Sequence, residues 1–307
     1  MLSRKSKLLI MKIVSLFSVV RGYNIPIIIL AQYLSAIFIL APEKKPIHVI
    51  LDINLLLIVL ATALTIASGY IINSFYDSKK DLINRPNKSI LDRLVSQQTK
   101  LRVYFALNFT VAFFAFLISF RAFLFFSVYI FLIWFYSHKV KKFVIIGNLM
   151  ATLMAILPFF ALLLYYKNFY EVIICHATFL FLLLLIREMI KDLENIKGDL
   201  ANDYKTIPIL HGELTSKKII SFLTLLTVFP VYLLIEKFEI GNMDLYFYSC
   251  LLFLLLFLLK LWKSDLKEHY LLLHNLLKFL IVSGVFSIIL INPSIVEYFW
   301  HKIVLLF

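Results

Sequence analysis

The sequence predicts an all-α integral membrane protein with nine transmembrane helices. Of its 307 residues, 62% are hydrophobic and only 16% are charged, and the mean hydropathy is +0.92. A soluble domain carries roughly 45–50% apolar and about 25% charged residues, so this composition excludes a soluble globular protein and a disordered chain. The two cysteines, Cys175 and Cys250, both lie in apolar runs and predict neither a disulfide framework nor a cysteine-based metal site.

Nine apolar runs are long enough to cross a bilayer, because a transmembrane helix needs about 20 mainly apolar residues. Together they predict a single transmembrane domain over residues 1–307. Pro158 and Pro230 lie inside two of the runs and predict kinks, with neighbouring groups pairing the freed carbonyls. In chain order the predicted spans are 24–41, 54–75, 101–119, 121–137, 143–166, 169–190, 218–236, 243–262 and 272–292.

Residues 1–20 predict a helix that lies in the membrane interface. Basic side chains alternate there with apolar ones, which is typical of an amphipathic interfacial helix rather than of a removable leader. The basic residues of this segment are Arg4, Lys5, Lys7 and Lys12.

The lysines and arginines orient the predicted bundle, because cytoplasmic loops of membrane proteins carry an excess of them. One side of the membrane receives 24 of the 31 and the other receives six, with Lys278 inside the last span. We therefore expect a protein of the cell inner membrane with a cytoplasmic N-terminus, an outside C-terminus, and cytoplasmic cap loops at 76–102 and 187–218. Basic loops suit an anionic leaflet, so the net charge of +13 predicts membrane lipids and no nucleic acid as partners.

Acidic residues concentrate in the two cap loops, which hold nine of the 18 aspartates and glutamates. Residues three or four apart share one face of a helix, so the polar residues of each segment form a stripe. The first acidic stripe is Asn73, Asp77 and Asp81; the second acidic stripe is Glu188, Asp192, Asn195 and Asp199.

The two stripes together predict a magnesium-dependent site for a polyanion. Clustered carboxylates repel one another and are costly at membrane depth, so both stripes should face a wet cavity or each other. Oxygen ligands without His or Cys favour Mg²⁺. Arg85, Lys141 and Lys191 lie beside the stripes, and Arg21 and Asn24 open the first span. Metal and cationic side chains around a diphosphate stabilise the charge that builds on a phosphate leaving group.

The stripes and their flanking residues resemble the two aspartate-rich motifs of the UbiA superfamily of intramembrane prenyltransferases. The first reads Asn73-x-x-x-Asp77-x-x-x-Asp81 followed by Ile-Asn-Arg-Pro, and the second runs from Arg187-Glu-x-x-Lys-Asp to Gly-Asp199. The resemblance spans residues 21 to about 285. Further positions similar to that family are Arg21-x-x-Asn24, Tyr136-Ser-x-x-x-Lys141 and Lys278.

The resemblance implies a bundle of nine helices around a central cavity with cytoplasmic cap loops. It also implies transfer of a prenyl group from a polyprenyl diphosphate bound through Mg²⁺. Its implied metal ligands are Asn73, Asp77 and Asp81 for one ion and Asp192 and Asp199, supported by Glu188, for another. The implied catalytic carboxylates are Asp77, Asp81, Asp192 and Asp199. The implied substrate-binding residues are Asn24, Arg85, Tyr136, Lys141, Arg187, Lys191 and Lys278.

The acceptor of the prenyl group has two candidates. Both motifs are most similar to members that transfer a geranylgeranyl group to a lipid glycerol phosphate and form an ether bond, and the alternative acceptor is an aromatic quinone precursor. A cation-coupled transporter is an alternative from a different class of protein, and it would place its carboxylates near the midplane of the membrane. An inactive scaffold is suggested by Ser74 and Asn195, which stand where members usually carry Asp.

Overall fold

The computed structural model describes the backbone of residues 4–294 and the side chains of residues 10–294, and within this part of the chain all regular structure is helical. Within residues 4–294, nine helical segments are long and apolar enough to cross a membrane, which confirms the predicted fold class. Their bounds are Gly22–Leu40, Ile53–Tyr76, Gln97–Ile118, Phe120–His138, Ile146–Tyr166, Glu171–Leu200, Ile207–Glu236, Gly241–Trp262 and Lys267–Ile291.

Within the part of the chain that the structure describes, five of the nine spans are single helices and four are composite. In the same part, five short helices lie before or between the spans. The single spans are α4 (Ile53–Tyr76), α7 (Gln97–Ile118), α8 (Phe120–His138), α9 (Ile146–Tyr166) and α10 (Glu171–Leu200). One composite span is η4 (Gly241–Met243) with α13 (Asp244–Trp262). The other three composite spans are η1 (Gly22–Asn24), α2 (Ile25–Ser35) and η2 (Ala36–Leu40); α11 (Ile207–Leu226) and α12 (Val228–Glu236); and α14 (Lys267–Ser287) with η5 (Ile288–Ile291). The short helices are α1 (Arg4–Val19), α3 (Pro46–Ile50), α5 (Ser78–Asn84), α6 (Pro86–Asp92) and η3 (Val140–Lys142).

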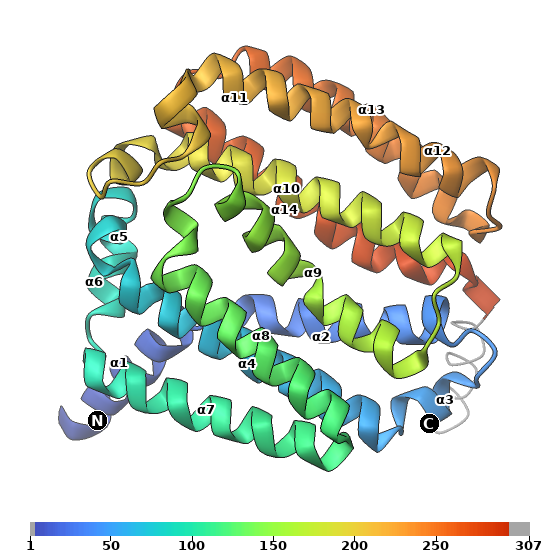
Figure 1. The fold of residues 1–307 in the computed structure, drawn as a ribbon, viewed down its shortest axis with the longest axis horizontal. Helices are drawn as coiled ribbons and strands as arrows, with labels where there is room; N and C mark the ends of the chain where they lie inside the picture. Colours follow the sequence, from blue (N-terminus) through green and yellow to red (C-terminus); the bar gives the residue numbers. More distant parts are fainter. Residues whose placement is uncertain (1–3, 295–307) are drawn as a thin grey trace.

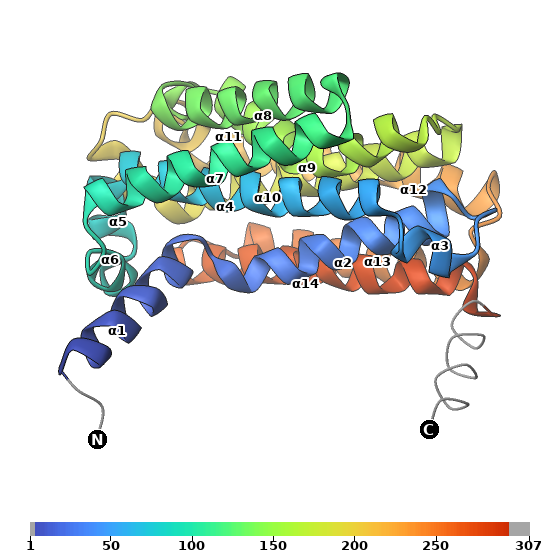
Figure 2. The same ribbon diagram turned by 90° about the horizontal axis from the view of Figure 1, so that it is seen from below.

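The spans run lengthwise beside one another, with α5 and α6 stacked at one end, here called the cap end, and α3 at the other (Figure 1). Seen from below, α2 and α14 lie together on one face of the bundle, and α7 and α8 lie on the opposite side (Figure 2). The long helix α10 is central and packs against α9, α11, α12 and α14. It also contacts α5, so the cap is fastened to the middle of the bundle.

The predicted cap loops are largely helical, which corrects their description as loops. Helix α10 continues to Leu200 and α11 begins at Ile207, so the segment 187–218 is helical apart from the connection 201–206 and a kink at Gly212, where φ is 79° and ψ is 164°. Charged residues after position 187 end the apolar run, but they are good helix formers, and Lys191 pairs with Glu188 one turn earlier at 2.6 Å. The segment 76–102 likewise contains α5, α6 and the start of α7.

Helix α1 slants away from the bundle at the cap end (Figure 2). It is fastened to the cap by Ser15, which donates to the Leu91 carbonyl at 2.8 Å, and by Ser18, which donates to Asp92 at 2.9 Å. Large apolar side chains of α1, such as Ile13 and Phe17, are exposed. The placement of this helix in the membrane interface stays a prediction.

Pro158 interrupts the hydrogen bonds of α9, because proline has no N–H to donate to the carbonyl four residues earlier. That carbonyl belongs to Met154, and it accepts a hydrogen bond from the Tyr129 hydroxyl of α8 at 2.9 Å. The Pro158 carbonyl accepts from the buried Gln32 amide of α2 at 3.0 Å. The predicted pairing of the freed carbonyl by a neighbouring helix is therefore present, and it connects α8 and α9.

Replacing Tyr129 with phenylalanine should destabilise the protein by about 1 kcal/mol, because the Met154 carbonyl loses its donor inside an apolar bundle. The measurement is the thermal unfolding midpoint in detergent. In a Pro158→Ala background the backbone N–H returns to the Met154 carbonyl, so Tyr129→Phe should cost less there. An equal loss in both backgrounds would contradict this explanation.

Candidate active site

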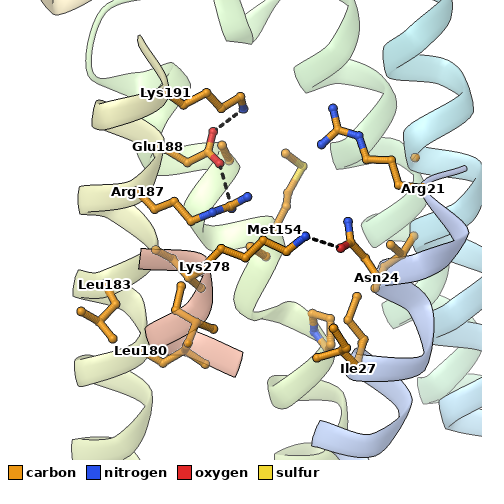
Figure 3. A pocket seen from close by; sticks show the side chains of 18 of the residues that line it. Arg21, Asn24, Ile27, Met154, Leu180, Leu183, Arg187, Glu188, Lys191 and Lys278 are labelled. Atoms are coloured by element: carbon orange, nitrogen blue, oxygen red, sulfur yellow. Dashed lines mark hydrogen bonds and ion pairs between the residues drawn. The ribbon is translucent and has the colours of Figure 1, made fainter. Parts of the chain in front are cut away.

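A cavity of about 680 Å³ opens within the bundle and is lined by side chains of α2, α4, α5, α9, α10 and α14. Its wall is polar toward the cap end, where Glu188, Lys191 and Arg21 lie, and apolar further along α10 at Leu180 and Leu183 (Figure 3). Of the predicted site residues, the cavity is lined by Asn24, Asn73, Asp77, Asp81, Arg85, Tyr136, Lys141, Arg187, Glu188, Lys191, Asp192 and Lys278. Asp199 is fully buried and stands behind this wall.

The first acidic stripe continues one helical register from α4 into α5. The Asp77 N–H donates to the Asn73 carbonyl at 2.9 Å, and the Asp81 N–H donates to the Asp77 carbonyl at 2.8 Å. All three side chains therefore lie on the cavity wall, as their spacing predicts.

Asp77 is held as a buried carboxylate by two donors. The Lys141 ammonium lies 2.6 Å from its Oδ1, and the Tyr204 hydroxyl donates to the same atom at 2.8 Å. Burial alone would raise the pKa of Asp77, but the charges of Lys141 and Lys80 outweigh it and keep that pKa below its ordinary value. Burial and the neighbouring Asp77 raise the pKa of Asp81. The two carboxylates of one stripe therefore differ in basicity.

The second acidic stripe places three of its four members on the cavity wall. Glu188 contacts Lys191 at 2.6 Å and Arg187 at 3.6 Å. Asp192 accepts a hydrogen bond from the Asn148 amide at 2.8 Å. The fourth member, Asp199, forms an ion pair with Lys80 of α5.

Three contacts join α5 to α10 and so bring the two stripes to one cavity. Besides the pair between Lys80 and Asp199, the Asn84 side chain accepts from the Gly198 N–H at 3.1 Å. Arg85 lies 3.3 Å from Glu194. Glu194 is also 3.2 Å from the His274 ring of α14.

Several residues of this network were not among the predicted ones. Lys80 lies within the first stripe, directly before Asp81, and its basic side chain inside an acidic motif was the available signal. Tyr204 lies in the short connection 201–206, and His274 lies on a helix distant in sequence, so neither position carried a local pattern. The full set missed is Lys80, Asn84, Asn148, Glu194, Tyr204 and His274.

The two departures from the family pattern occupy different environments. Ser74 is buried and lies outside the cavity wall, with its hydroxyl 3.5 Å from the Lys100 ammonium. Asn195 lines the cavity and donates to the Lys191 carbonyl at 2.7 Å. Ser74 therefore removes no carboxylate from the cavity, and Asn195 leaves an oxygen ligand there.

The acidic residues are suitable ligands for metal ions that bind oxygen, such as Mg²⁺, if the substrate supplies the remaining ligands. Among the described residues, no three or more His, Cys, Asp or Glu side chains gather into one metal-binding group. Mg²⁺ usually binds one or two carboxylates and fills its remaining positions with water and substrate phosphates, so such a group is not needed. Asp199 is 0% exposed, and among the residues that the structure describes its Oδ2 has no hydrogen-bond partner and Lys80 is its one ion-pair partner. A buried carboxylate in this state calls for a further cation.

The nine helices and the acid-lined cavity define an intramembrane protein with a polyanion site at one end. Residues 29–290 match the model of the UbiA prenyltransferase family, and the protein therefore belongs to that family.

The chain is also similar to curated relatives over part of its length. It is 37% identical over 169 residues to the digeranylgeranylglyceryl phosphate synthase of Thermococcus sibiricus, which is 53% of this chain and 58% of that protein. It is 25% identical over 204 residues to the enzyme of the same name from Sulfurisphaera tokodaii, covering 66% of this chain and 71% of that protein. The match thus spans less than two thirds of the first relative.

Two solved structures share the fold over nearly the whole chain. One comes from work on digeranylgeranylglyceryl phosphate synthase in membranes, with a TM-score of 0.67 and 19% identity over 91% of this chain and 97% of that one. The other is a UbiA homologue from Archaeoglobus fulgidus bound to GPP and Mg²⁺, with a TM-score of 0.66 and 15% identity over 90% and 99%. At these identities the likeness establishes the fold.

Gly198→Ala should loosen the cap, because an added Cβ would overlap with the Asn84 side chain that now accepts the Gly198 N–H. We expect a loss of about 1–3 kcal/mol, seen as a lower unfolding midpoint and faster proteolysis between residues 77 and 96. Lys197→Ala, at an exposed neighbour on the same helix, is the control. Unchanged proteolysis in Gly198→Ala would mean that this contact does not hold the cap.

Proposed function

We propose that this protein is a Mg²⁺-dependent prenyltransferase that transfers a geranylgeranyl group from its diphosphate to the hydroxyl of a lipid glycerol phosphate. The bond between the prenyl C1 and the diphosphate oxygen breaks, an ether bond forms to the acceptor oxygen, and the hydroxyl proton and diphosphate leave. The observation that supports this proposal most strongly is one cavity that joins both acidic stripes, their cationic partners and an apolar extension.

The metal ligands in this proposal are the members of the two stripes. Asn73, Asp77 and Asp81 would hold one ion, and Asp192 and Asp199, supported by Glu188, the other. When bound, Mg²⁺ neutralises charge on the diphosphate and makes it a better leaving group. The A. fulgidus homologue bound to GPP and Mg²⁺ supports the choice of ion.

The side chains of this protein would bind the diphosphate and shelter the reacting carbon. Lys141, Lys191 and Arg85 lie on the cavity wall beside the acids and can donate to phosphate oxygens. The Tyr136 ring lies on the same wall and can face a developing allylic cation. Further along the cavity, side chains such as Leu180 and Leu183 give the prenyl chain a dry surface that excludes water.

The choice of a lipid glycerol phosphate over an aromatic acceptor is supported by the names of the curated relatives. The transporter alternative is not favoured, because both stripes lie at the cap end rather than at mid-span. The excess of lysine and arginine on that side supports a cytoplasmic cap end in the cell inner membrane.

Purified protein with radiolabelled geranylgeranyl diphosphate and Mg²⁺ should label geranylgeranylglyceryl phosphate, and chelation of the metal should abolish the product. The parallel reaction contains 4-hydroxybenzoate in place of the lipid. A labelled product with only the aromatic compound would overturn the acceptor, and no product with either would overturn the transfer reaction.

Asp77→Asn and Asp192→Asn should each reduce kcat by about 100-fold or more, since each removes a carboxylate from the proposed metal and diphosphate site. Asp265→Asn is the matched control, because it removes one exposed carboxylate from the turn that leads into α14. Turnover that is unchanged in both site variants would reject this site.

A further inference from the structure

The cations of the cavity wall fall into two groups that differ in their partners. Five of them contact a carboxylate: Lys80, Arg85, Lys141, Arg187 and Lys191. The remaining two, Arg21 and Lys278, have no carboxylate within 4.0 Å among the residues that the structure describes. Two positive charges on one wall of a cavity, without an acid between them, favour a bound anion.

Aromatic and amide groups hold these two cations in place without neutralising them. The Arg21 guanidinium lies 5.0 Å from the centre of the Tyr70 ring, and the Lys278 ammonium lies 4.9 Å from that of Tyr23. Lys278 also donates to the Asn24 side chain at 2.9 Å. Figure 3 shows Lys278 reaching across the cavity to Asn24 while Arg21 points into the same space.

The backbone that presents Arg21 is strained. Arg21 adopts a left-handed conformation (φ 48°, ψ 49°), which is unfavourable for a residue other than glycine. The Phe17 ring of α1 lies against the next residue, Gly22, where a Cβ would overlap with it. Strain of this kind concentrates at binding and catalytic sites.

We propose that Arg21, Asn24 and Lys278 form a separate subsite for the phosphate group of the lipid acceptor, with Tyr23 and Tyr70 supporting it. This inference rests on the proposed function and assigns the second substrate of that reaction. The five acid-paired cations remain with the diphosphate.

The position of the cluster suits a phosphate that arrives with a lipid. The cluster joins the α1–α2 junction to α14, and these elements lie on one face of the bundle (Figure 2). Tyr23 lines the cavity but is 55% exposed, so the cluster borders the outside of the bundle as well as the cavity. A lipid with its headgroup at the cap end can therefore place its phosphate here while its chains stay among the apolar side chains.

The test uses the full chain in detergent with a short-chain ether lipid of glycerol phosphate as the probe. The increase in unfolding temperature that this probe causes, relative to the same lipid without phosphate, reports binding without turnover. Arg21→Gln and Lys278→Gln should each weaken probe binding about 10- to 100-fold, as for the loss of one charge-assisted hydrogen bond. Binding of geranylgeranyl diphosphate should change by less than about twofold.

The variants separate loss of charge from loss of structure. A glutamine at position 278 can still donate to Asn24, so the contact between α14 and α2 is retained, and Arg21→Lys should keep most of the probe affinity. Lys197→Gln removes an exposed cation of α10 and should leave the affinity for both ligands unchanged. In turnover, the two glutamine variants should raise KM for the acceptor and leave KM for the diphosphate unaltered.

Equal weakening for probe and diphosphate would place the cluster in the donor site and overturn the proposal. Inorganic phosphate that binds as tightly as the lipid probe would overturn it too, because the lipid would then contribute nothing. The variants could show the expected binding pattern although the protein transfers no prenyl group. That result would support the phosphate subsite and would reject the proposed function.

Discussion

Burying carboxylates in an apolar helical bundle is the constraint on which this structure depends. An unpaired buried charge is far more costly than a paired one, and Asp77 and Asp199 are both almost inaccessible to solvent. Their partners, Lys141 and Lys80, come from the connection between α8 and α9 and from α5. The short helices at the cap end are therefore needed to bring cations to acids that the long helices carry.

The same pairing prepares the cavity for its proposed substrates. A lysine that pairs with a buried carboxylate is already desolvated and held in one orientation. Little further side-chain entropy is therefore lost when it binds phosphate. In the proposed reaction, the carboxylates would hold Mg²⁺, and the lysines that now pair with them would bind the diphosphate. Within the described part of the chain, Arg21 and Lys278 have no carboxylate within 4.0 Å, which makes them suited to an anion that brings no metal with it.

Local patterns in the sequence predicted the spans and the acidic stripes, whereas contacts that depend on packing could not be predicted from it. Apolar length predicted the spans, and the four-residue step of Asn73, Asp77 and Asp81 predicted their common face, which is confirmed. The continuation of α10 to Leu200 was missed because a hydropathy scan ends at the first charges, whereas helix propensity does not. Tyr204 contacts Asp77 across 127 positions of chain, and no local pattern reports such a contact.

One chain of contacts shows why the cap, the central helix and α14 have to act together. Arg85 of the first motif pairs with Glu194 of α10, and Glu194 in turn lies 3.2 Å from His274 of α14. The His274 ring accepts from Arg187 at 3.2 Å through Nε2, so its proton resides on Nδ1 and faces Glu194. Arg187 then contacts Glu188 on the cavity wall at 3.6 Å. The end of α5 is therefore connected to the second acidic stripe through α10 and α14 along the cavity wall, so one continuous polar network sets the geometry of both motifs.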